Sequence, residues 1–100
     1  MGDWTSLTNH ALVLVCIARE RRASMRAMAA CVGITERAVQ EIVNDLAETG
    51  YITRHRVGAR NVYELNCELP LRHPLVRGAA IGELLSPLVD GAEGGAAQPA

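Results

Sequence analysis

Three arginines lie close together in a part of the chain that holds no acidic residue. They are Arg54, Arg56 and Arg60, and no Asp or Glu occurs between Tyr51 and Val62. A guanidinium group presents its N–H donors in a fixed plane that matches phosphate oxygens, and it also suits a narrow minor groove of DNA. This cluster favours contact with a nucleic-acid backbone, and the alternative is a solvated hairpin tip without a ligand.

A second group of polar residues precedes the arginines at helical spacing. Its members are Thr35, Glu36, Arg37, Gln40, Glu41 and Asn44, and Asn61 follows the arginine cluster. Arginine pairs well with guanine and glutamine with adenine, so we expect Arg37 and Gln40, together with Thr35, to contact bases. Asn44 would add a contact one turn later. Glu41 either accepts a hydrogen bond from a cytosine amino group or repels phosphate.

The charges of the chain are segregated although they nearly cancel. All 10 basic residues are arginines, and the net charge of the 100 residues is -1. Residues 19–60 hold eight arginines and five acidic residues, whereas residues 61–100 hold two and five. A polyanion site must therefore come from the first of these two parts. We expect Asp45 or Glu48 to pair with one of the first two arginines of the cluster.

The composition argues against several other classes of protein. The longest apolar run has eight residues, 11–18, whereas a membrane-spanning helix needs about 20. Cys16, Cys31 and Cys67 lack C-x-x-C spacing, so we expect no metal site and no disulfide framework, and a reducing cytoplasm is favoured. Cys16 and Cys31 fall on apolar faces, which predicts small core residues, with redox sensing as the alternative. No catalytic set, phosphate loop or cofactor motif occurs, so we expect neither an enzyme nor a cofactor.

Caps and apolar spacing predict three helices that position these residues. They are expected over 8–21, 25–33 and 35–49. Thr8 and Thr35 are typical N-caps, and Gly33 stands where a left-handed backbone is easiest without a Cβ. The first helix is apolar on every face and must be enclosed, unless it is a buried strand. The third helix has one buried face, formed by Ala38, Val39, Ile42, Val43 and Leu46.

A β-hairpin is expected to follow the third helix. Segments 51–57 and 61–66 are rich in β-branched and aromatic residues, and they flank a turn at 58–60 that contains glycine. Because two strands alone are marginally stable, we expect a third short strand over 23–25 to complete a small sheet.

The C-terminal part of the chain is predicted to contain one more helix. Two prolines make residues 69–74 a connector. After Gly78 an apolar stripe predicts a helix; the stripe consists of Ile81, Leu84, Leu85, Leu88 and Val89. Residues 90–100 show no periodicity, which predicts a disordered tail.

The second and third helices have the packing pattern of a helix-turn-helix. Small or turn-forming residues stand where the two helices meet, and apolar residues fill the space between them: Met28, Ala29, Val32, Gly33, Ile34, Val39 and Ile42. An ordinary pair of antiparallel helices is the alternative, but the hairpin directly behind the pair favours the DNA-binding type.

The stretch from Trp4 to about Leu88 resembles compact bacterial winged helix-turn-helix transcription regulators of the MarR-like type. The matching residues are 28–40, 46–52 and, in the hairpin or wing, 54–61. The resemblance implies a homodimer whose third helix enters the major groove of double-stranded DNA, while the wing reaches the flanking backbone or minor groove. The chain is shorter than that type, has one modest C-terminal helix, and lacks an acidic residue among the wing arginines.

The predicted fold is therefore α+β and mainly α. A winged helix-turn-helix of three core helices and a wing spans 1–77, a dimerisation helix spans 78–89, and a disordered tail spans 90–100. The side chains expected at the dimer interface are Trp4, Leu7, Ile81, Leu84, Leu85 and Leu88. The expected function is sequence-specific transcriptional regulation, with a small-molecule effector left open. A winged-helix protein-protein interaction module without DNA binding is the alternative, which the acidic residues of the third helix favour.

Overall fold

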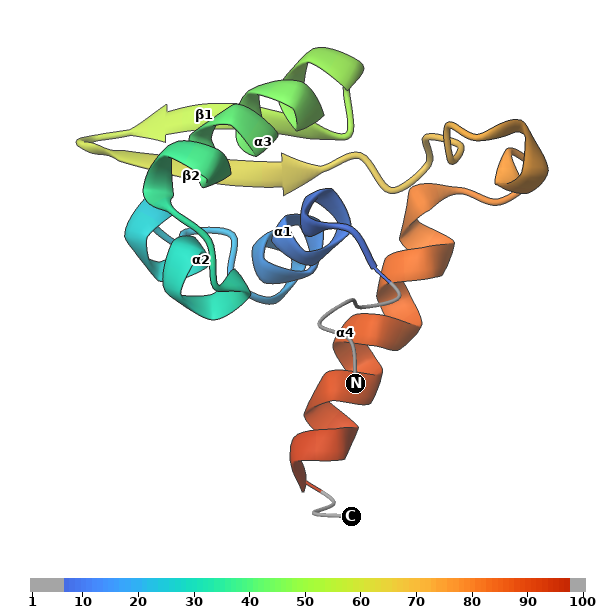
Figure 1. Cartoon of the computed structure of the whole chain (residues 1–100). Coiled ribbons are helices and arrows are strands. Elements are labelled where there is room, and N and C mark those ends of the chain that lie inside the picture. Colours follow the sequence, from blue (N-terminus) through green and yellow to red (C-terminus); the bar gives the residue numbers. More distant parts are fainter. Residues whose placement is uncertain (1–6, 98–100) are drawn as a thin grey trace.

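The computed structural model describes residues 7–97, which form four α-helices and one antiparallel β-hairpin (Figure 1). The elements are α1 (Asn9–Arg19), α2 (Met25–Val32), α3 (Glu36–Thr49), β1 (Ile52–Val57), β2 (Arg60–Leu65), a 3-10 turn (Pro74–Val76) and α4 (Ile81–Ala97). The fold is α+β and mainly helical, as the sequence predicts, and its elements are compatible with a winged helix. None of the helices in the described range is long and apolar enough to cross a bilayer.

Side-chain caps and glycines set the ends of α1, α2 and α3. The hydroxyl oxygens of Thr8, Ser24 and Thr35 accept hydrogen bonds from backbone N–H groups three residues on, at 3.2, 3.0 and 3.0 Å. α2 ends at Gly33 and α3 at Gly50, where φ is +88° and +90°. Side chains with a Cβ rarely adopt this left-handed backbone, so these two glycines fix where each helix stops.

The hairpin joins β1 and β2 by a two-residue turn, with Val57 opposite Arg60 and Ile52 opposite Leu65. Gly58 is the only residue of the turn with positive φ, at +64°, which is the pattern of a type II′ turn. Arg60 therefore belongs to β2 rather than to the turn that the sequence predicts.

The third strand expected over 23–25 is wrong, because the sheet has two strands. Ser24 is the N-cap of α2 and Met25 is its first residue, so the segment enters the helix before it can pair. What remains of the expected pairing is one backbone hydrogen bond, in which Tyr63 N–H donates to the carbonyl oxygen of Arg21 at 3.0 Å.

One apolar core joins α1, α2, α3, the hairpin and the first turns of α4. Its buried members are Val13, Leu14, Ile17, Met28, Ala29, Val39, Ile42, Val43, Leu46, Tyr51, Ile52, Tyr63, Ile81 and Leu85. α1 lies at the centre of this arrangement, since it contacts α2, α3, α4 and β2 (Figure 1). The prediction that this apolar helix must be enclosed is confirmed in part: Val13, Leu14 and Ile17 are buried, and the other apolar residues of 11–18 are half-buried.

The start of α4 is held by backbone bonds to the segment that follows β2. Ile81 N–H donates to the carbonyl oxygen of Leu69 at 2.7 Å, and Gly82 N–H donates to that of Cys67 at 2.9 Å. α4 begins three residues after the predicted start and continues to Ala97, so the tail predicted to be disordered from residue 90 is helical up to that point. A helix already begun adds further residues at little cost, which here outweighs the low helix propensity of Gly91, Gly94 and Gly95.

Gly82 allows the close approach between α4 and the turn after β2. A Cβ at this position would stand 2.6 Å from the Cβ of Cys67 and 3.0 Å from its carbonyl oxygen. In an open helix Gly→Ala gains up to about 1 kcal/mol, but overpacking costs roughly 1–3 kcal/mol. We therefore expect Gly82→Ala to lower the free energy of unfolding in urea. Gly78→Ala is the control, because nothing lies within 4 Å of its added Cβ. A stabilised Gly82→Ala variant would contradict the contact.

Candidate nucleic-acid interface

The polar residues predicted to face a ligand are on the outer side of α3. Thr35, Glu36, Arg37, Gln40, Glu41 and Asn44 are all exposed, while Val39, Ile42, Val43 and Leu46 of the same helix are buried. The amphipathic pattern alone is enough to separate these two faces. Thr35 has a structural role as well, since its hydroxyl caps the helix through the N–H of Ala38.

The hairpin lies against α3, so the two predicted groups of residues are brought together. α3 contacts β1 directly, and the guanidinium of Arg54 donates from Nη1 to Oδ1 of Asn44 at 3.1 Å. The hairpin tip and the first turn of α3 both lie on the left of Figure 1, away from α4. The exposed face of α3 and the arginine-bearing wing therefore belong to one continuous surface.

Strand register divides the wing residues between two faces of the hairpin. Ile52, Arg54 and Arg56 share one face of β1, because successive side chains alternate across a strand. Across from them on β2 stand Leu65, Tyr63 and Asn61. Since Ile52 and Tyr63 are buried, this face is the one turned to the helices. Arg54, Arg56 and Asn61 continue it toward the tip, and Arg60, opposite Val57, lies on the other face.

The acidic residues at the start of α3 are paired with arginines. Arg37 Nε lies 3.8 Å from a carboxylate oxygen of Glu41, and Arg26 Nε lies 3.5 Å from one of Glu36. The side chains of Arg37 and Glu41 are 90% and 70% exposed, so their pairing contributes little energy and is easily exchanged for another partner. Local charge at this end of α3 is balanced rather than acidic.

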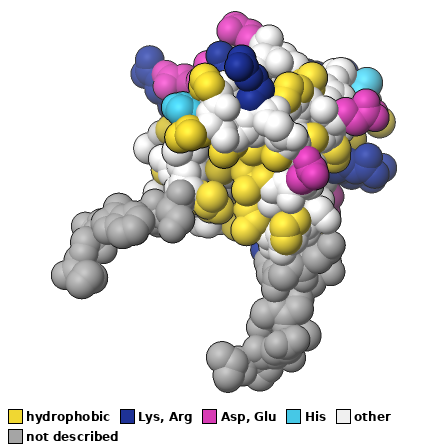
Figure 2. Space-filling model, turned by 90° about the vertical axis from the view of Figure 1, so that its right-hand side faces the viewer, with side chains coloured by type: hydrophobic (Ala, Val, Ile, Leu, Met, Phe, Trp, Pro, Cys, Tyr) yellow, Lys and Arg dark blue, Asp and Glu magenta, His cyan; other side chains and the backbone are white. Residues whose placement is uncertain are grey.

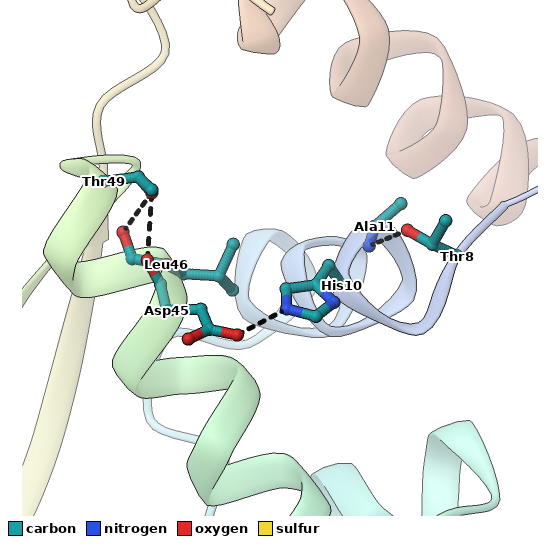
Figure 3. Close-up of polar contacts among 6 residues, drawn as sticks. All are labelled: Thr8, His10, Ala11, Asp45, Leu46 and Thr49. Carbon is teal, nitrogen blue, oxygen red and sulfur yellow. Dashed lines mark hydrogen bonds and ion pairs between the residues drawn. The ribbon is translucent and has the colours of Figure 1, made fainter. Parts of the chain in front are cut away.

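Asp45 is directed away from the wing. Its Oδ2 contacts Nε2 of His10 on α1 at 2.9 Å, as Figure 3 shows. The prediction that Asp45 pairs with a wing arginine is therefore wrong, because α1 crosses α3 at this turn and supplies a nearer partner. No ion pair of Glu48 is found within residues 7–97. His55 of the wing is also engaged, with Nε2 at 3.0 Å from Oε1 of Glu64.

The wing arginines carry positive charge that no carboxylate of the described chain offsets. Arg54 bonds to the neutral amide of Asn44, and Nε of Arg56 donates to the carbonyl oxygen of Gly58 at 3.2 Å. All three arginines are exposed. On the surface formed by the outer face of α3 and the wing, the charges at the start of the helix are paired, whereas the arginines of the wing are not. Such a surface suits a polyanion that also has polar groups able to bond to the helix.

A second feature, which the sequence analysis missed, is an open cavity of about 510 Å³ between α1, α3 and α4. Buried Leu14, Leu46 and Ile81 line it together with exposed His10, Asp45 and Arg72. Hydrophobic side chains gather in the middle of this side of the molecule in Figure 2, with charged groups around them. No spacing in the sequence marks the cavity, because its walls come from segments far apart in the chain.

The residues predicted for a dimer interface are used in different ways. Ile81 and Leu85 are buried in the chain's own core, whereas Leu7, Leu84 and Leu88 are half-buried. Ile81 and Leu85 are therefore not accessible to a partner, and the periodicity could not show which members of the stripe face the core. Trp4 lies outside the described residues.

Groups of three or more metal-ligating side chains do not occur among residues 7–97. Comparison of the chain with models of known protein families finds no match, and a search of curated proteins finds no relative.

Proposed function

We propose that this protein is a sequence-specific DNA-binding transcriptional regulator. On this proposal α3 enters the major groove of a duplex, and the β1–β2 wing contacts the flanking backbone or minor groove. The observation that carries the proposal is the contact between Arg54 and Asn44, which holds Arg54 of the wing beside the exposed face of α3. A major groove about 12 Å wide admits one helix, and the adjacent phosphates are then within reach of a hairpin at its side.

Each exposed residue has a role that follows from its chemistry. Arg54, Arg56 and Arg60 contact phosphates, which fixes the orientation of α3 but carries little sequence information. Gln40 has no side-chain partner among the described residues and is free to bond adenine. Arg37 contacts guanine after its ion pair with Glu41 breaks, which costs little free energy because both side chains are exposed.

The proposed binding form is a homodimer. Two copies on one duplex would double the few base contacts of one α3, and their combined affinity would exceed that of either alone. The half-buried Leu84 and Leu88 of α4 are the side chains that support a second copy at this helix. The arrangement predicts a target with two-fold symmetry and a fixed distance between its halves.

Selection of bound sequences from a random duplex pool tests both parts of the proposal. We expect enriched sites with two related halves, and an affinity for random duplex that falls linearly with the logarithm of salt concentration. An enriched site without symmetry would contradict the homodimer and leave the DNA contact standing. Absence of binding to any duplex at low salt would contradict the DNA contact, and would favour the protein-interaction module that the carboxylates of α3 suggest.

A further inference from the structure

Cys16 of α1 and Cys31 of α2 lie next to each other where these two helices pack. Both line one shallow hollow of about 370 Å³, and Cys31 is near enough to Cys16 to raise its pKa. The hollow is also lined by Arg19, Glu20, Ala23, Ala27 and Met28. The sequence separation of 15 positions hides this pairing, which depends on how α1 crosses α2.

The two thiols have unequal surroundings. Cys31 is exposed, in the last turn of α2 before Gly33, whereas Cys16 is half-buried. The pKa of Cys16 is raised to about 11. Burial is the largest cause, the neighbouring Cys31 adds to it, and Arg19 opposes it. Burial therefore disfavours the thiolate of Cys16, whereas the sulfur of Cys31 is open to solvent and to a dissolved oxidant.

We propose that Cys16 and Cys31 form an oxidation site, in which a peroxide converts the two thiols into a disulfide that joins α1 to α2. The exposed thiolate of Cys31 attacks the peroxide, so an S–O bond forms as the O–O bond breaks. With hydrogen peroxide the leaving hydroxide takes up a proton and departs as water, and Cys31 becomes a sulfenic acid.

The second step closes the disulfide. The sulfur of Cys16 attacks the sulfur of Cys31, an S–S bond forms, and the S–O bond breaks. The departing hydroxide combines with the thiol proton of Cys16 to give a second water. Two thiols and one hydrogen peroxide thus yield one disulfide and two waters, with two electrons passing from sulfur to the peroxide.

The geometry explains why the second step follows the first. Burial raises the pKa of Cys16, and the guanidinium of Arg19 opposes this change and favours the thiolate that attacks. The residues that carry the attacking and receiving sulfurs already line the same hollow. The cross-link closes a loop within the helical core, which restricts the unfolded chain, so we expect the oxidised protein to unfold at a higher temperature.

Cys67 provides a matched control. It is also exposed, but it lies after β2, where its carbonyl oxygen accepts a bond from Gly82 N–H at the start of α4. It does not line the hollow between α1 and α2. A general reactivity of exposed cysteines would oxidise Cys67 as readily as Cys31.

Peptide mapping decides between these outcomes. The reduced full-length protein is treated with hydrogen peroxide, alkylated, and digested with trypsin without reductant. Cleavage after arginine places the three cysteines on separate peptides, 1–19, 27–37 and 61–72. We expect a product in which 1–19 is linked to 27–37, and reductant should release both. This result does not depend on DNA binding.

Variants make the expected order of events visible. Cys67→Ser should leave the linked product unchanged, and Cys31→Ser should abolish it. In Cys16→Ser the sulfenic acid on Cys31 should persist and react with dimedone, since no thiol is near enough to resolve it. The proposal is overturned if Cys31 proceeds to sulfinic acid beside an unmodified Cys16, if peptide 27–37 links to 61–72 or to itself, or if peroxide leaves both thiols alkylated.

Discussion

Replacing Arg54, Arg56 and Arg60 together by alanine is expected to weaken binding to every duplex sequence. Each phosphate contact that is lost should lower the slope of log affinity against log salt by about one. For three contacts the loss of affinity at 0.1 M salt is on the order of 100- to 1000-fold relative to the parent, because counterion release scales with the number of neutralised phosphates. Mobility shift or fluorescence titration over a salt series measures both quantities.

The control for this prediction removes arginines from another part of the surface. Arg72 and Arg77 are exposed between β2 and α4, and the double variant Arg72→Ala with Arg77→Ala should leave the salt slope as it is in the parent. Thermal unfolding of each variant checks that the fold is kept. Equal losses in the two variants would mean that overall charge, rather than the wing, holds the duplex.

Leu85→Ala is expected to cost about 2–5 kcal/mol of unfolding free energy, the usual range for a buried leucine. Its side chain is 3% exposed, and it anchors α4 to the core that α1 centres. Leu75→Ala removes the same atoms from a side chain that is 87% exposed on the 3-10 turn, so a change within about 0.5 kcal/mol is expected.

Urea unfolding at constant protein concentration measures both leucine variants. Because both variants lose the same atoms, the difference between their unfolding free energies reports the effect of burial alone. Similar losses in the two variants, or a loss below about 1 kcal/mol at Leu85, would mean that α4 does not share the core.

Local chemistry explains which parts of the fold could be read from the sequence. Thr8 and Thr35 cap helices because a hydroxyl reaches a backbone N–H three residues away, and Gly33 and Gly50 end helices through their own backbone freedom. These causes act within one turn, so they are visible in the chain itself. The hairpin is equally local, and its predicted turn differs from the observed one only at Arg60, which belongs to β2.

Contacts between distant segments could not be read in this way. His10 meets Asp45 across 35 positions, and Arg54 meets Asn44 only because β1 packs on α3. The apolar stripe of α4 likewise indicates burial but not the surface that buries it: the sequence predicts a dimer interface for Ile81 and Leu85, and both are buried in the chain's own core. The outer face of α3 is exposed, as the sequence predicts, because the spacing of apolar residues within one helix determines which face is buried. Its role in DNA recognition stays a proposal.

The partners of α3 inside the chain limit what one copy could discriminate. Glu41 is engaged by Arg37, Asn44 by Arg54 and Asp45 by His10, which leaves Gln40 as the side chain with the freest choice of bond. On the proposed docking, such a helix can make few base-specific contacts. The specificity for a target would then depend mainly on the spacing and orientation of two short half-sites, rather than on the base sequence of either.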